Sequence, residues 1–92
     1  MNDLETSRRR AAYRAAHRGT KEMDILLGRF AAEHLPAMDT AELARFERFL
    51  SVPDPELQAA ILSGDRQQAT EFADLVAAIR SHHGLPGERP RD

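Results

Sequence analysis

The sequence predicts an all-α fold, a small bundle of five helices, and three observations support this prediction. Apolar residues recur at helical spacing along most of the chain, and no segment alternates with the period of two that marks a strand. Helix start and stop signals divide the chain into five segments. Apolar residues make up 41% of the chain, enough for a compact core despite the 30% of charged residues.

The length of 92 residues predicts one domain, 1–92, with room for a modest core. That core is expected to span about 8–82, and 83–92 is expected to be a polar tail without periodicity. The chain has one tyrosine, four phenylalanines and no tryptophan. Its core is therefore predicted to be mostly aliphatic and alanine-based.

The first helix is predicted over about 3–18, a segment without glycine or proline. Alanine and arginine, both good helix formers, dominate it. Its apolar stripe is thin and consists of Leu4, Ala11, Ala12 and Ala15. Gly19 follows at the position where helices commonly end in a left-handed residue.

The second helix is predicted over 21–35, with Thr20 as its N-cap and Pro36 as its stop. Its apolar face repeats every three to four residues. That face consists of Met23, Leu26, Leu27, Phe30, Ala31 and His34. His34 is expected to be packed and hydrogen-bonded near the helix end.

The third helix is predicted to open with a capping box formed by Asp39 and Glu42 and to be over by Pro53. Its inward residues are Leu43, Phe46, Phe49 and Leu50. Asp54 and Pro55 restart the chain as a short fourth helix, because proline is preorganised for the first helical turn. Gly64 is predicted to close that helix.

The last helix is predicted to begin between Asp65 and Thr70. The fourth and fifth helices bury apolar residues at helical spacing. These residues are Leu57, Ala60 and Ile61 in the fourth helix and Phe72, Leu75, Val76 and Ile79 in the fifth.

The side chains that enzymes use are few, so no catalytic residue, metal site or cofactor site is predicted. The chain has no cysteine, which excludes disulfides, thiolate metal sites and cysteine nucleophiles. Its serines lie in no nucleophile elbow, and its five glycines are scattered rather than gathered into a phosphate loop. No histidine pair has the spacing of a helical metal site. His82 and His83 are adjacent, so their side chains are expected to diverge into solvent.

The charge is unevenly spread around a net value of −2. Residues 1–21 are basic, whereas 22–79 carry a clear excess of acids. A basic helix containing Arg8, Arg9 and Arg10 can lie along phosphates, and Tyr13 can stack on a base. The sequence pI of about 6.1 and the acidic body argue against a long polyanion as partner. We expect no nucleic-acid partner.

The apolar runs are far shorter than a membrane span, so no membrane insertion is expected. The first ten residues, MNDLETSRRR, contain no apolar segment of the kind that a secretory signal requires. We therefore expect a cytoplasmic protein.

The eight residues HRGTKEMD, at 17–24, separate the first two predicted helices and admit two interpretations. In the first, they are a helix junction. Arg18 suits the negative end of one helix dipole, Glu22 suits the positive end of the next, and Gly19 supplies the turn. In the second, the same residues form a surface that binds a partner.

The segments around this junction favour the second interpretation through their order and spacing. The R-G-x-x-E pattern at 18–22 is followed by an acid and by a leucine-rich helix with Phe30. ELARFERFL comes next, and then D-P-E-L at 54–57. Over about 8–82 the sequence resembles the SdhE family, the flavinylation or assembly factors of succinate dehydrogenase, which includes the mitochondrial succinate dehydrogenase assembly factor 2.

The resemblance implies a small helical bundle that binds the flavoprotein subunit of succinate dehydrogenase, and in bacteria often that of fumarate reductase. It implies that the chain promotes covalent attachment of FAD to a histidine of that subunit. The bond forms on the partner, so the chain is expected not to be an enzyme and to hold no cofactor stably. A monomer is expected.

The resemblance also implies which residues bind the partner: Arg14, Arg18, Gly19, Glu22 and Asp24. Gly19 lets the backbone approach closely, and Arg18 can bind a carboxylate or carbonyl through two donors. Glu22 can pair with a basic residue, and Arg14 lies one turn before Arg18 on the same face.

The fourth helix departs from the family pattern, and two other functions stay open. Family members often carry aromatic residues where this chain has Gln58 and Ala60, so a partner contact through those aromatics is in doubt. One alternative is an antitoxin-like interaction module, a role also assigned to family members. The other is a nucleic-acid binder acting through the basic first helix.

Overall fold

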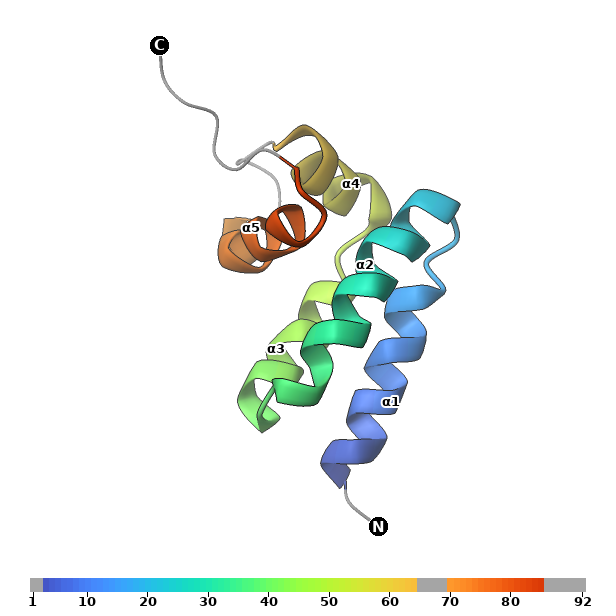
Figure 1. Cartoon of the computed structure of the whole chain (residues 1–92), viewed down its shortest axis with the longest axis vertical. Helices are drawn as coiled ribbons and strands as arrows, with labels where there is room; N and C mark the ends of the chain where they lie inside the picture. Colours follow the sequence, from blue (N-terminus) through green and yellow to red (C-terminus); the bar gives the residue numbers. More distant parts are fainter. Residues whose placement is uncertain (1–2, 65–69, 86–92) are drawn as a thin grey trace. The chain divides into compact units, whose positions relative to one another are not determined.

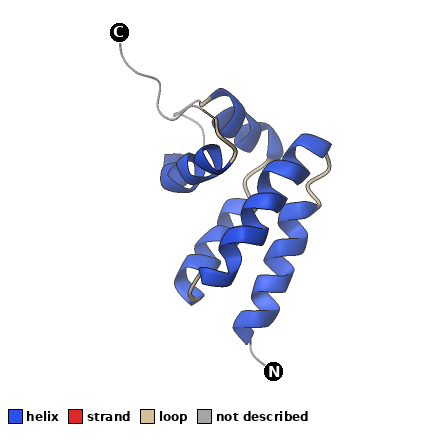
Figure 2. Ribbon diagram, viewed as in Figure 1, coloured by secondary structure: helices blue, strands red, loops and turns tan. Residues whose placement is uncertain are grey.

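The structure, a computed structural model, describes residues 3–64 and 70–85. Within these ranges the chain forms five α-helices and two short 3₁₀-helices and no strand (Figure 2). The all-α prediction is confirmed. The chain divides into two compact units, 1–51 and 52–92. The single domain over 1–92 stays a prediction, and most of its polar tail, 86–92, lies outside the described residues.

The first unit consists of three α-helices in which short connections reverse the chain (Figure 1). They are α1 (Asp3–Ala16), α2 (Lys21–His34) and α3 (Thr40–Leu50), with the 3₁₀-helix η1 (Leu35–Ala37) after α2. α1 packs against both α2 and α3. The helix with the thinnest apolar stripe in the sequence is therefore the one on which the other two pack.

Small residues explain how α1 can occupy this place. Its buried residues are Ala11 and Ala15, both with no exposed surface. A Cβ atom added to Gly28 on α2 would lie only 3.2 Å from the Cα of Ala16. α1 and α2 therefore approach closely at a point where neither helix carries a large side chain.

The start signals of the second and third helices act as predicted. The Thr20 hydroxyl accepts a hydrogen bond from the backbone N–H of Met23 (3.3 Å). The Asp39 carboxylate accepts from the Glu42 N–H (2.8 Å), and the Glu42 carboxylate accepts from the Asp39 N–H (2.9 Å). This reciprocal capping box satisfies two donors that the start of α3 would otherwise leave unpaired.

The core of the first unit is mostly aliphatic, as the composition predicted, and it also contains a cluster of aromatic rings that was not predicted. Phe46 lies 6.1 Å from Phe30 and 5.9 Å from Phe49, measured between ring centroids. His34 is half-buried at the edge of this cluster, where its ring stacks on Phe30 at 4.3 Å. The buried aliphatic residues of α2, η1 and α3 are Met23, Leu26, Leu27, Ala31, Leu35, Leu43 and Leu50.

The second unit contains α4 (Asp54–Ser63), the 3₁₀-helix η2 (Thr70–Phe72) and α5 (Ala73–His82). Gly64 closes α4 in the left-handed conformation (φ 69°), as predicted. The buried Arg80 of α5 donates a hydrogen bond to the Ile61 carbonyl near the end of α4. A Cβ atom at Gly64 would lie 3.3 Å from the guanidinium carbon of Arg80, so the Arg80 side chain also packs closely against Gly64. Arg80 thus connects α5 to the end of α4.

Three predictions about helix ends and histidines are wrong. α1 ends at Ala16 rather than at 18, because the next backbone N–H groups find a different acceptor, described below. α5 begins at Ala73, after the 3₁₀-turn of η2, rather than between 65 and 70; of that interval, 65–69 lies outside the described residues. His82 and His83 do not diverge, since both are half-buried and their rings meet edge to face at 4.8 Å.

Among the described helices, none is both long and apolar enough to cross a membrane.

Candidate docking surface at the α1–α2 junction

The structure brings the five predicted partner-binding residues to one end of the first unit. Arg14 lies in the last turn of α1, and Arg18 and Gly19 lie in the connection to α2. Glu22 and Asp24 lie in the first turn of α2. Their side chains have different roles, however, because three of them form bonds within the chain.

Asp24 holds the backbone of the connection in place. Its Oδ1 atom accepts hydrogen bonds from the backbone N–H groups of Arg18 (2.5 Å) and Gly19 (3.3 Å). These bonds draw the chain out of the helical path, which explains why α1 ends at Ala16. The half-buried Asp24 carboxylate thus shapes the junction, and a direct contact between Asp24 and a partner stays a prediction.

Replacing Asp24 with alanine is expected to destabilise the fold, because two backbone donors at the junction lose their acceptor. The Arg18 N–H is part-buried and the Gly19 N–H is exposed, so water can replace part of the lost bonding. Loss of a typical hydrogen bond costs about 0.5–1.5 kcal/mol, and 1 kcal/mol lowers the melting temperature of a domain of this size by about 4–8 °C. Asp24→Asn keeps an oxygen acceptor at the same place and is the matched control. The measurement is thermal unfolding followed by circular dichroism. If Asp24→Ala and Asp24→Asn both had the melting temperature of the wild type, the structural role of the Asp24 carboxylate would be wrong.

Three arginines one helical turn apart, Arg10, Arg14 and Arg18, connect α1 and the junction to the end of α3. Arg10 binds the Glu47 carboxylate with two donors, at 2.9 and 3.2 Å. Glu47 raises the pKa of Arg10 through this hydrogen bond and its charge. The Arg14 guanidinium donates to the Ser51 hydroxyl at 3.3 Å.

Arg18 makes the last of these connections, donating from Nη1 to the Leu50 carbonyl at 2.6 Å. Leu50 is the final residue of α3, so this cation lies at the negative end of the α3 dipole, where positive charge is stabilising. Arg14 and Arg18 therefore act within the chain, and a contact between either of them and a partner stays a prediction.

The arginines of the basic first helix find acceptors within the described part of the chain. Arg8 donates to the Met38 carbonyl at 2.8 Å, and Arg9 lies 3.8 Å from the Glu5 carboxylate. Arg10, Arg14 and Arg18 also donate to acceptors within the chain, although each guanidinium keeps further N–H donors. The nucleic-acid alternative, whose main evidence was this cluster, stays a prediction.

Gly19 and Glu22 are the two predicted site residues that face solvent. Gly19 is exposed, with φ +118°, a conformation that side chains rarely adopt. A Cβ atom there would meet no heavy atom within 4 Å, so the space beside Gly19 is open. Glu22 is exposed, and its side chain makes no hydrogen bond or ion pair with any described residue. Both are therefore accessible to a partner.

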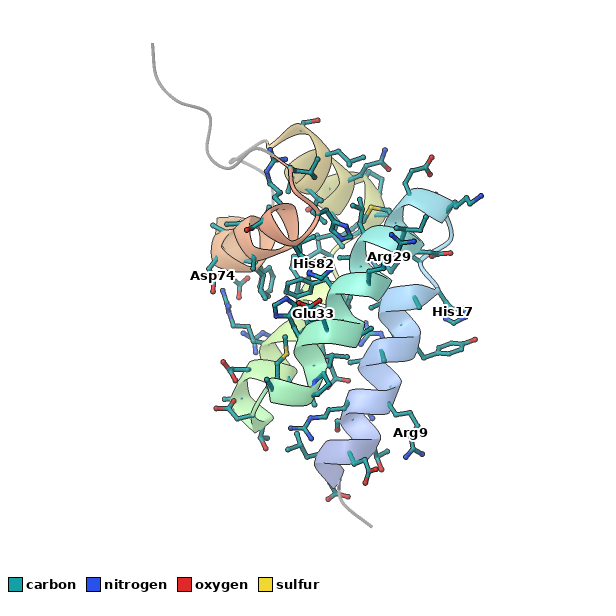
Figure 3. The ribbon with its side chains drawn as sticks, viewed as in Figure 1. Arg9, His17, Arg29, Glu33, Asp74 and His82 are labelled. Carbon is teal, nitrogen blue, oxygen red and sulfur yellow. The ribbon has the colours of Figure 1, made fainter. Side chains whose placement is uncertain are left out.

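An aromatic pair beside Gly19 extends this accessible region. Tyr13 is 65% exposed, and its ring stacks on His17 with centroids 4.0 Å apart. His17 Nδ1 lies 2.8 Å from the Tyr13 carbonyl oxygen, which fixes the imidazole orientation. Figure 3 shows His17 on the outer side of the chain, where α1 meets the connection.

This pair was not predicted from the sequence, although its spacing of four residues is one at which helical neighbours meet. We define the docking surface as the exposed residues Tyr13, His17, Gly19 and Glu22.

The first unit is a small all-α bundle that carries this docking surface at one end. Comparison with known proteins identifies the family to which the chain belongs. Residues 9–83 match the family described as "Flavinator of succinate dehydrogenase", and the chain belongs to this family. The resemblance inferred from the junction motif is confirmed.

Individual relatives agree with this assignment. The "FAD assembly factor SdhE" of Acetobacter pasteurianus is 46% identical over 56 residues, 61% of this chain and 51% of the relative. The mitochondrial "Succinate dehydrogenase assembly factor 2" of Dictyostelium discoideum is 29% identical over 83 residues, 90% of this chain and 58% of the relative. The matched part of the chain thus spans a little over half of the length of these two relatives. No solved structure matches the chain.

Proposed function

We propose that this chain binds the flavoprotein subunit of succinate dehydrogenase and promotes covalent attachment of FAD to it. The observation that carries the proposal is the exposure of Gly19 and Glu22 in a chain of the flavinator family. These two motif residues are the ones that the fold leaves open, whereas Arg18 is bonded within the chain. Gly19 and Glu22 belong to the family motif, yet their exposed positions contribute little to packing within the chain. A role in binding would explain why the motif includes them.

The docking surface offers a partner three kinds of contact. The stacked Tyr13 and His17 rings are already held in one arrangement, so they lose little conformational freedom on binding, and tyrosine is frequent among residues that dominate binding energy. Gly19 lets a partner's backbone or side chain approach the main chain. Glu22 supplies a charge for a basic residue of the partner.

Promotion of the reaction would follow from binding alone. In this proposal FAD and the histidine that receives it belong to the partner, and the chain is neither an enzyme nor a holder of FAD. Binding favours the partner conformation in which that histidine reaches the flavin. A binding protein can shift such an equilibrium only by its difference in affinity for the two conformations. Tight contacts through Glu22 and Tyr13 are therefore needed specifically with the competent conformation.

Glu22→Gln is expected to weaken binding to the flavoprotein about 10- to 100-fold, the range that corresponds to loss of a charge-assisted hydrogen bond. The melting temperature should change little, because Glu22 has no partner among the described residues. The measurement is flavin fluorescence in the flavoprotein band on a denaturing gel, from a host that lacks the wild-type gene.

Glu56→Gln is the matched control for this variant. Glu56 is also an exposed acid in the first turn of a helix, α4, so both changes remove the same favourable interaction with a helix dipole. Only Glu22→Gln should lower the flavin signal. Equal signals in the two variants would count against a binding role for Glu22. A flavin signal that persists without the gene would instead favour the antitoxin-like alternative.

A further inference from the structure

A groove lies at the opposite end of α1 from the docking surface, between the first turns of α1 and the end of α2. Its volume is about 300 Å³, enough for one or two side chains. The apolar part of its lining consists of Ala12, Ala31, Ala32, Leu35 and Pro36, and the charged part consists of Glu5, Arg8 and Arg9. Figure 1 shows these parts of α1 and α2 side by side, and Figure 3 shows Arg9 on the outer side of α1.

Arg8 has a hydrogen-bonding group that the described residues do not satisfy. One end of its guanidinium donates to the Met38 carbonyl, but Nε is shut off from solvent and has no acceptor. A buried donor without a partner is unfavourable, and few such groups persist in folded proteins. An acceptor from outside the described chain would reach Nε only if the Arg8 side chain shifted, and that shift would relieve the unsatisfied donor.

Arg9 adds a second cation, whose ion pair is weak enough to be replaced by a pair with another carboxylate. Its ion pair with Glu5 is 3.8 Å long, and the two side chains are 78% and 64% exposed. Exposed pairs of this kind contribute little to stability, so Arg9 can exchange Glu5 for another carboxylate with little loss. The groove thus combines apolar walls with two guanidinium groups and the single carboxylate of Glu5, which gives its lining a net positive charge.

We propose that this groove is a second contact for the flavoprotein subunit and receives an acidic segment of that subunit. An apolar side chain of the segment would lie against Ala12 and Ala32, and a carboxylate would bind Arg8 and Arg9. This inference rests on the proposed function. The net positive charge of the lining, two arginines against Glu5, favours an acid, and the apolar walls favour a peptide over a polyphosphate chain, which has no apolar side chain to place there.

The position of the groove makes it independent of the junction. Arg8 precedes Arg18 by ten residues, which corresponds to about 15 Å along a helix. No single side chain of a partner covers both places. The partner would therefore contact the chain along the length of α1, and loss of one contact should weaken binding without abolishing the other.

Ala32→Glu tests the proposal because Ala32 is exposed and lines the groove. The new carboxylate would fill the groove from the chain's own helix and compete for Arg8 and Arg9. Ala44→Glu, at an exposed alanine of α3, adds the same charge elsewhere. Binding to purified FAD-free flavoprotein subunit is measured by titration calorimetry. We expect Ala32→Glu to weaken binding at least tenfold, Arg9→Gln several-fold, and Ala44→Glu less than twofold.

The outcomes separate this inference from the proposed function. Wild-type affinity in both Ala32→Glu and Arg9→Gln, together with weak binding by Glu22→Gln, would overturn the groove contact and leave the proposed function standing. Absence of binding by the wild-type chain would overturn both. If the wild type self-associates and Ala32→Glu makes it monomeric, the occupant is a second copy of the chain, and the proposal is wrong. Circular dichroism must show that each variant is helical.

Discussion

Gly19→Arg is expected to abolish covalent flavin attachment to the partner while leaving the chain helical. The space beside Gly19 is open, because a Cβ atom there would meet no heavy atom of the described chain within 4 Å, so an arginine side chain would start from the docking surface into free space. A partner that approaches the backbone at Gly19 would meet this side chain first. The positive φ of 118° adds strain of about 1–3 kcal/mol to any residue with a Cβ atom, less than the stability of a typical domain.

The control for this variant must place an arginine at another glycine of positive φ without obstructing the docking surface. Gly84→Arg does so, because Gly84 has a positive φ (71°), is exposed and has no described heavy atom within 4 Å of a Cβ position. Its φ lies near the left-handed helical region, where a side chain is less strained than at 118°, so Gly19→Arg should lose more stability than Gly84→Arg in thermal unfolding. Only Gly19→Arg should lose flavin fluorescence in the flavoprotein band. If Gly19→Arg unfolds while Gly84→Arg does not, Gly19 is a structural residue and the junction is only a connection.

The features that sequence reasoning predicted correctly depend on residues close together in the chain. The N-cap at Thr20 and the capping box of Asp39 and Glu42 each join residues three apart. The left-handed end of α4 depends on the conformational freedom of Gly64 alone. Such signals can be recognised in a single sequence because the physical cause and its effect lie within one helical turn.

Two of the features that it missed, the bonds of Arg14 and Arg18, depend on contacts between distant residues. Arg18 donates to Leu50, 32 positions away, and Arg14 donates to Ser51, 37 positions away. In the sequence both arginines belong to a basic cluster that suggests a surface for a partner. Only the packing of α1 on α3 shows that their donors are bonded within the chain. The family resemblance identified the motif, but it did not separate the residues that shape the junction from those that face solvent.

Replacing Gly28 with leucine is expected to have the largest effect on stability of the variants considered. In the sequence Gly28 is a single glycine within a helical pattern, where it costs about 1 kcal/mol relative to alanine. In the structure a Cβ atom at this position would lie 3.2 Å from the Cα and 3.3 Å from the Cβ of Ala16. Leucine adds three more carbon atoms towards α1, and overpacking of this kind typically costs 1–3 kcal/mol or somewhat more.

Gly28→Ala separates the two effects. Alanine gains about 1 kcal/mol of helix propensity and requires Ala16 to move by only a few tenths of an ångström, so its melting temperature should stay within about 4–8 °C of the wild type. Gly28→Leu should lower the melting temperature well beyond that range. Because α1 carries Tyr13 and also holds the end of α3, its displacement should weaken flavoprotein binding as well. Equal melting temperatures for the leucine and alanine variants would show that α1 and α2 do not approach closely at Gly28.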